Sequence, residues 1–81
     1  MVKVHLWSSA RSVLDGVETV ELEAKNAREL LQRLAAEYPA LQSQVDRGIA
    51  VSIDGVIHNT PSFQPIDENS EIYLLPRMAG G

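Results

Sequence analysis

The stretch "NARELLQRLAAEYP", residues 26–39, is the feature of the chain that most restricts its fold. Asn26 is followed three residues later by Glu29, the arrangement of a helix capping box, and Pro39 cannot continue a helix. Between them the apolar side chains recur at helical spacing and form one stripe: Ala27, Leu30, Leu31, Leu34, Ala35 and Tyr38. The pattern predicts one amphipathic helix, whose single apolar stripe needs a second layer to cover it.

Alternating apolar residues ahead of this helix predict two strands. In the first, over residues 2–8, the apolar side chains alternate with Lys3, His5 and Trp7. The segment "SSARSVLDG", residues 8–16, is interpreted as a polar connection that ends in an Asp-Gly turn. Residues 17–24, "VETVELEA", alternate again and predict the second strand, which would form a hairpin with the first.

The remainder of the chain predicts three more strands. Residues 40–48, "ALQSQVDRG", are expected to add one or two short helical turns that end at a glycine cap. A third strand follows over residues 49–53, and Asp54-Gly55 favours the tight turn of a hairpin leading to a short fourth strand. Residues 60–70 read as a loop, and residues 71–76 predict a last strand that Pro76 ends.

This order of elements predicts an α+β domain with the β-grasp topology, a mixed sheet of four to five strands packed on one principal helix. In that topology the first and last strands lie parallel at the centre of the sheet. We expect the domain to span residues 1–76 and to be followed by a flexible Gly-Gly tail over residues 77–81. The sheet residues expected under the helix are Val4, Leu6, Val20, Leu22, Val51, Ile53, Ile72 and Leu74.

Composition narrows the classes of function. The chain has 81 residues, enough for one modest core, and it has no cysteine, so neither disulfides nor thiolate metal sites are available. Its net charge of −4 argues against nucleic acid and favours a protein partner. We find no signal peptide or membrane-spanning segment in the sequence, so the cytoplasm is the expected location.

Four segments carry a resemblance to a known family: "VKVHLWSSARSVLDG", "NARELLQRLAAEYPAL", "VSIDGVI" and "EIYLLPRMAGG". Together they resemble the small ubiquitin-like sulfur carriers, above all the small subunit of molybdopterin synthase, with the sulfur carrier of the thiamin pathway as a relative. The similarity extends over essentially the whole chain. Its most specific part is the end, Ala79-Gly80-Gly81.

The resemblance implies a role for the carboxyl terminus. In the family an ATP-using activating enzyme adenylates the last glycine, here Gly81, and a sulfur donor converts it to a thiocarboxylate. The tail is then inserted into the active site of a partner, the large synthase subunit, where the sulfur is delivered. No cofactor is expected on this chain, because the ATP is used by the activating enzyme. The residues suit this chemistry, because Gly80 and Gly81 lack a Cβ and can enter a narrow active site.

The rest of the tail has simpler expected roles. Ala79 and Met78 continue it, and Pro76 stiffens its departure from the sheet. Arg77 has two interpretations that the sequence leaves open: it pairs with an acidic group of a partner, or it only keeps the tail soluble.

A second set of residues predicts a docking surface. His5, Trp7, Tyr73 and Leu75 fall on one side of the two central strands, where they would form an exposed apolar and aromatic patch beside the tail. The alternative is that they are scattered surface residues without a role. His5 and the isolated His58 lack ligand spacing, so no metal site is expected, and Glu18, Glu21 and Glu23 are interpreted as the solvated side of an edge strand.

Three classes of function are compatible with these features: a sulfur carrier, a ubiquitin-like protein modifier and a plain interaction module. The favoured one is the small subunit of molybdopterin synthase, because residues 40–48 fill a gap that is shorter in the thiamin carrier. A carrier for thiamin or cysteine synthesis is the alternative within the same chemistry. The other two classes are a ubiquitin-like protein modifier joined through Gly81 to lysines, and an interaction module with an inert tail.

Overall fold

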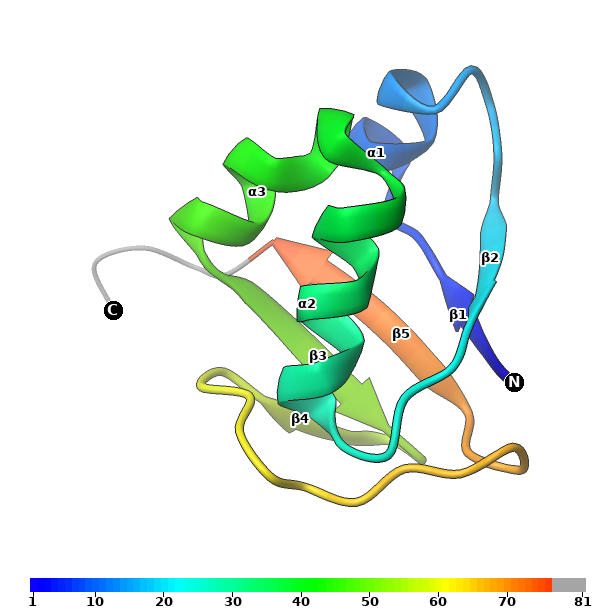
Figure 1. Ribbon diagram of the computed structural model, residues 1–81, viewed down its shortest axis with the longest axis vertical. Helices are drawn as coiled ribbons and strands as arrows, with labels where there is room; N and C mark the ends of the chain where they lie inside the picture. The colour runs from blue at the N-terminus through cyan, green and yellow to red at the C-terminus, as the bar shows by residue number, and fades with distance from the viewer. Residues whose placement is uncertain (77–81) are drawn as a thin grey trace.

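The computed structural model describes residues 1–76, which form a sheet covered on one face by helices (Figure 1). The strands are β1 (Val2–His5), β2 (Thr19–Leu22), β3 (Ile49–Ile53), β4 (Val56–His58) and β5 (Ile72–Pro76). The helices are α1 (Ser8–Val13), α2 (Ala27–Glu37), the 3-10 turn η1 (Pro39–Leu41) and α3 (Gln42–Arg47). No helix within residues 1–76 has the length and apolar character needed to cross a membrane.

The sheet has the predicted topology, with strand order β2-β1-β5-β3-β4. β1 and β5 lie side by side and parallel near the centre, where Val4 is opposite Ile72 and His5 is opposite Tyr73. The other three pairings are antiparallel. Because β1 and β5 run in the same direction, both strands end at the same edge of the sheet.

Helix α2 forms as its sequence predicts. The Asn26 side chain accepts a hydrogen bond from the backbone N–H of Glu29 at 2.8 Å, which satisfies one free donor of the first turn. Ala27, Leu30 and Leu34 are fully buried, while Leu31 and Tyr38 are half-buried and pack against the edge of the core. The helix ends before Pro39, and η1 and α3 occupy the segment in which short helical turns were expected.

The core lies between α2 and the sheet. All eight sheet residues expected under the helix are buried, and they are Val4, Leu6, Val20, Leu22, Val51, Ile53, Ile72 and Leu74. The β3–β4 hairpin also follows its prediction, since Asp54 and Gly55 both adopt the positive φ angles of its tight turn, 49° and 88°. The Asp54 carboxylate accepts the backbone N–H of Glu71 at 2.8 Å and so fixes this turn to the start of β5.

The prediction for residues 6–14 is wrong. The first strand ends at His5 rather than at residue 8, and the segment interpreted as a polar connection contains helix α1. Ala10 on this helix is fully buried in the core, and the Arg11 Nε donates to the Leu6 carbonyl oxygen at 3.1 Å. Tertiary packing therefore stabilises a helix of six residues that has no side-chain cap at its start.

Candidate functional site

The sheet face opposite the helices is the candidate functional site, and we call it the open sheet face. On the inner strands the residues that alternate with the core positions point to this side. The pairing registers place one residue from each strand in a row across it: Thr19, His5, Tyr73, Ser52 and Ile57. Lys3, Glu21, Ala50 and Leu75 complete the face.

The centre of the open sheet face is an aromatic pair. The His5 and Tyr73 rings are stacked, with centroids 4.4 Å apart and planes inclined by 14°. The Tyr73 hydroxyl donates a hydrogen bond to the Glu71 Oε1 at 3.0 Å. That bond, together with the negative charge of Glu71, raises the pKa of the Tyr73 phenol above its ordinary value.

Apolar side chains extend the face towards β4. Leu75 is half-buried opposite Ala50, and Ile57 is 57% exposed opposite Ser52. Ala50 and Ser52 are small and buried, so the exposed apolar area here comes from the larger residues around them. Ile57 was not among the predicted site residues, although its exposure and position make it part of this surface.

A hollow of about 430 Å³ lies where the open sheet face meets α1. Lys3, His5 and Tyr73 line it from the sheet, and Arg11 lines it from the helix. The Arg11 Nη1 lies 3.7 Å from the Glu18 Oε1, and the two side chains form an ion pair at the edge of this hollow. The rim of the open sheet face is thus charged and polar around an aromatic and apolar centre, as in many protein interfaces.

The structure brings together three of the four residues predicted for docking. His5, Tyr73 and Leu75 share the open sheet face, whereas Trp7 follows β1 as the N-cap residue of α1 and packs, half-buried, against the core. His58 lies on β4 opposite Val51. Within residues 1–76 no three His, Asp or Glu side chains gather closely enough to hold a metal ion.

The predicted reactive end follows β5. Pro76 is exposed, pairs with Ile49 and is the last residue of that strand. Arg77, Met78, Ala79, Gly80 and Gly81 lie outside the described residues, so their roles stay predictions. The same strand that carries Tyr73 and Leu75 on the open sheet face therefore leads directly into the predicted reactive segment.

Comparison with known proteins identifies relatives of this arrangement. A family profile described as "ThiS family" matches residues 4–81. The Amycolatopsis orientalis BexX/CysO complex contains a chain with 17% sequence identity and a TM-score of 0.75, and the match covers 100% of both chains. SAMP1 from Haloferax volcanii has 23% identity and a TM-score of 0.74, with 99% of this chain and 98% of that chain covered.

A third similar structure is the complex of subunits 1 and 2 of molybdopterin-converting factor from Helicobacter pylori 26695. One of its chains has 20% identity and a TM-score of 0.65, with 99% of this chain and 97% of that chain covered. No curated protein matches the sequence. These likenesses confirm the β-grasp fold that the order of elements predicts.

Proposed function

Because the chain belongs to the ThiS family of ubiquitin-like sulfur carriers, we propose that it carries sulfur as a thiocarboxylate on Gly81. The observation that carries this proposal is the family match itself, which continues through the Gly-Gly end to residue 81. In the specific form of the proposal, the chain is the small subunit of molybdopterin synthase and donates its sulfur for the molybdenum cofactor.

The proposed chemistry uses the terminal carboxylate. Its oxygen attacks the α-phosphorus of ATP on an activating enzyme, and pyrophosphate leaves. Hydrosulfide supplied by a donor then attacks the carbonyl carbon, the carbon–oxygen bond to AMP breaks, and AMP leaves. Loss of the proton on sulfur gives the thiocarboxylate, with no change of oxidation state. Gly80 and Gly81 leave this carbonyl unhindered, and ATP belongs to the partner enzyme.

The open sheet face supplies the docking surface in this proposal. Exposed Tyr73 and Ile57 are the large side chains that anchor interfaces, and Leu75 lies beside them on the strand that precedes the tail. A partner seated on β5 is therefore close to the point where the tail begins. The expected partners are the activating enzyme and the large synthase subunit.

The choice of pathway rests on the segment between α2 and β3, which η1 and α3 fill. The carrier of the thiamin pathway is the more compact relative in this region, and this difference favours the molybdopterin role over the thiamin role. Carriers for cysteine synthesis and protein modifiers share the adenylation step. A carrier for cysteine synthesis would differ in the molecule that receives its sulfur, whereas a modifier would transfer the Gly81 carbonyl to a lysine amine.

Intact mass of the protein purified from its native host tests the proposal. Exchange of one terminal oxygen for sulfur supports a carrier. Isopeptide adducts on other proteins would support a modifier instead, and an unmodified terminus under all growth conditions would contradict both. Co-purification with the large subunit of molybdopterin synthase would support the specific pathway, while co-purification with an enzyme of thiamin or cysteine synthesis would overturn it.

A further inference from the structure

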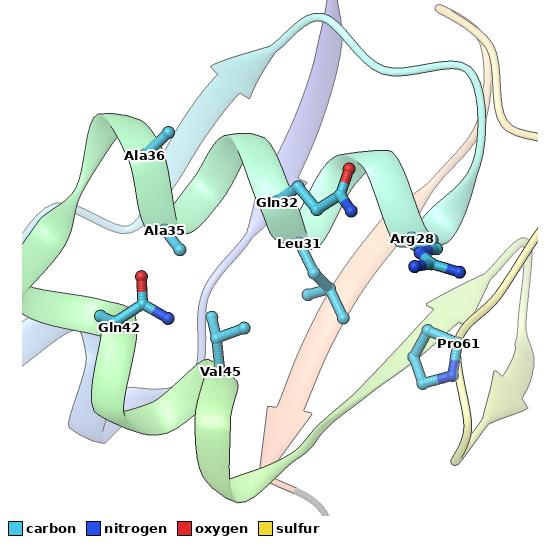
Figure 2. Close-up of a pocket in the computed structure, with 8 residues that line it drawn as sticks. All are labelled: Arg28, Leu31, Gln32, Ala35, Ala36, Gln42, Val45 and Pro61. Carbon is cyan, nitrogen blue, oxygen red and sulfur yellow. The ribbon is translucent and has the colours of Figure 1, made fainter.

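The helical layer carries a groove that the sulfur-carrier proposal does not use. It lies between α2 and α3, has a volume of about 450 Å³ and has Pro61 and Arg28 at one end (Figure 2). Successive turns of α2 contribute Arg28, Leu31 and Ala35 to its wall, and α3 contributes Val45. The groove is on the opposite side of the domain from the open sheet face, because the helices cover the other face of the sheet (Figure 1).

The floor of the groove is apolar and shallow. Leu31 and Val45 are half-buried and pack against the core. Ala35 and Ala36 end at Cβ, so the space that a larger side chain would fill stays open. The wall formed by the loop is fixed, because the Arg28 N–H donates to the Ser62 carbonyl at 2.8 Å and the Ala27 N–H donates to the Gln64 carbonyl at 3.0 Å.

The groove also has a defined charge. Among the described residues that line it, Arg28 is the one charged side chain. Its guanidinium carbon lies 5.7 Å from the centroid of the Phe63 ring, an interaction that holds the cation at the rim. The whole chain carries a net charge of −4, whereas this end of the groove carries the positive charge of Arg28. A positive charge at this position favours an acidic ligand.

We propose that the groove is a second docking site, which binds a peptide segment of a partner protein with an apolar side chain next to a carboxylate. The apolar side chain contacts Leu31 and Val45, and the carboxylate pairs with Arg28. A small metabolite fits less well, because Gln32, Ala36 and other lining residues are exposed and such ligands are mostly enclosed. Two partners could then bind opposite faces at once, whatever the chemistry at Gly81.

The probe for this site is the peptide acetyl-Glu-Leu-Leu-Glu-amide, added to the ¹⁵N-labelled full chain and followed by amide chemical shifts. We expect shifts in α2, in α3 and at Ser62, and much weaker shifts with the matched peptide that has lysine in place of glutamate. Arg28→Glu should weaken binding of the acidic peptide roughly fivefold or more, since it reverses the charge that pairs with it.

Two further variants distinguish binding in the groove from a general effect of the charge of the protein. Arg33→Glu makes the same charge change on an exposed α2 residue outside the groove, so it should leave binding within about twofold of wild type. Ala35→Leu keeps every charge and extends a larger side chain toward Gln42 and Val45, so it should fill the groove and abolish the shifts (Figure 2). Thermal unfolding checks that each variant is folded, and Glu at position 28 suits the positive end of the α2 dipole.

Several results would overturn the proposal: no shifts with the acidic peptide, equal binding of both peptides, equal losses in Arg28→Glu and Arg33→Glu, or shifts confined to the open sheet face. The sulfur-carrier proposal does not depend on this outcome. Leu75→Glu, which changes the opposite face, should leave peptide binding intact, so the two docking sites can be tested separately.

Discussion

The imidazole of His5 and the phenol of Tyr73 stack at 4.4 Å across the two parallel central strands. These strands come from opposite ends of the chain, so the contact joins the first strand to the one that precedes the tail. An aromatic pair of this kind adds to the stability of neighbouring strands and presents a flat surface to a partner. The pairing of β1 with β5 therefore fixes the position of β5 and also places His5 and Tyr73 together at the centre of the proposed docking surface.

The first prediction concerns Tyr73 and Glu71. Because the hydrogen bond and charge of Glu71 raise the pKa of the Tyr73 phenol, Glu71→Gln should lower that pKa towards its ordinary value. The raised pKa favours the protonated phenol in the folded protein. Its contribution to stability is thus present below the unfolded pKa, about 10, and is lost as the pH rises through the folded pKa.

Phenolate absorbance against pH measures this change in a Tyr38→Phe background, where Tyr73 is the one remaining tyrosine. Glu68→Gln is the control, because Glu68 contacts the amino terminus instead. Superimposable titration curves for Glu71→Gln and its parent would show that Glu71 does not act on the phenol.

The open sheet face predicts a pair of matched variants on β4. Ile57→Glu should weaken binding of the activating enzyme or the large subunit roughly tenfold or more, as expected for an apolar interface anchor. Val56→Glu is the control, since Val56 is 58% exposed, close to the 57% of Ile57, but the neighbouring residue of a strand points to the other side. Titration calorimetry measures both affinities, and equal losses would remove Ile57 from the interface.

Trp7 should behave as a structural residue. Trp7→Glu is expected to lower the free energy of unfolding by about 2 kcal/mol, because the ring packs against the core at the start of α1. Compared with Trp7→Glu, Leu75→Glu should lower the free energy of unfolding less and weaken partner binding more. Chemical denaturation followed by circular dichroism compares them, since Trp7 is the single tryptophan and fluorescence would be lost. A Trp7→Glu midpoint equal to wild type would contradict the packing assignment.

The helix stripe predicts a graded loss of stability on α2. Leu34 is 0% exposed, so Leu34→Ala should leave a cavity and lower the free energy of unfolding by about 2–5 kcal/mol. Leu31→Ala should cost less, because Leu31 is half-buried at the edge of the core. Denaturation midpoints, compared between variants with equal slopes, measure which variant loses more stability. A larger loss for Leu31→Ala than for Leu34→Ala would show that Leu31, rather than Leu34, faces the centre of the core.

Residues with strong local signals were predictable from the sequence. The capping Asn26, the stripe through Leu34 and the Asp54-Gly55 turn each depend on neighbours close in the chain. Helix α1 lacks such signals, because it has a single small core residue, Ala10, and no side-chain cap. Its formation depends on packing that periodicity does not reveal.

The candidate site was predictable only in part. His5, Tyr73 and Leu75 could be placed on one face because strand alternation is long enough in β1 and β5 to assign sides. In β4 the apolar residues Val56 and Ile57 are adjacent, so only the pairing of Ile57 with Ser52 tells which of them faces the partner. The groove was not foreseen, since Pro61 meets α2 only in the folded chain.

The central claim is that the carboxyl carbon of Gly81 receives the sulfur, and one measurement tests it most directly. The chain is incubated with the activating enzyme, ATP and a sulfur donor, and its intact mass is recorded beside two variants, one lacking Gly81 and one with an extra residue after it. We expect oxygen-to-sulfur exchange in the wild type alone, with all three proteins folded. Exchange in the extended variant without prior trimming would contradict the claim, because its Gly81 carbonyl is an amide.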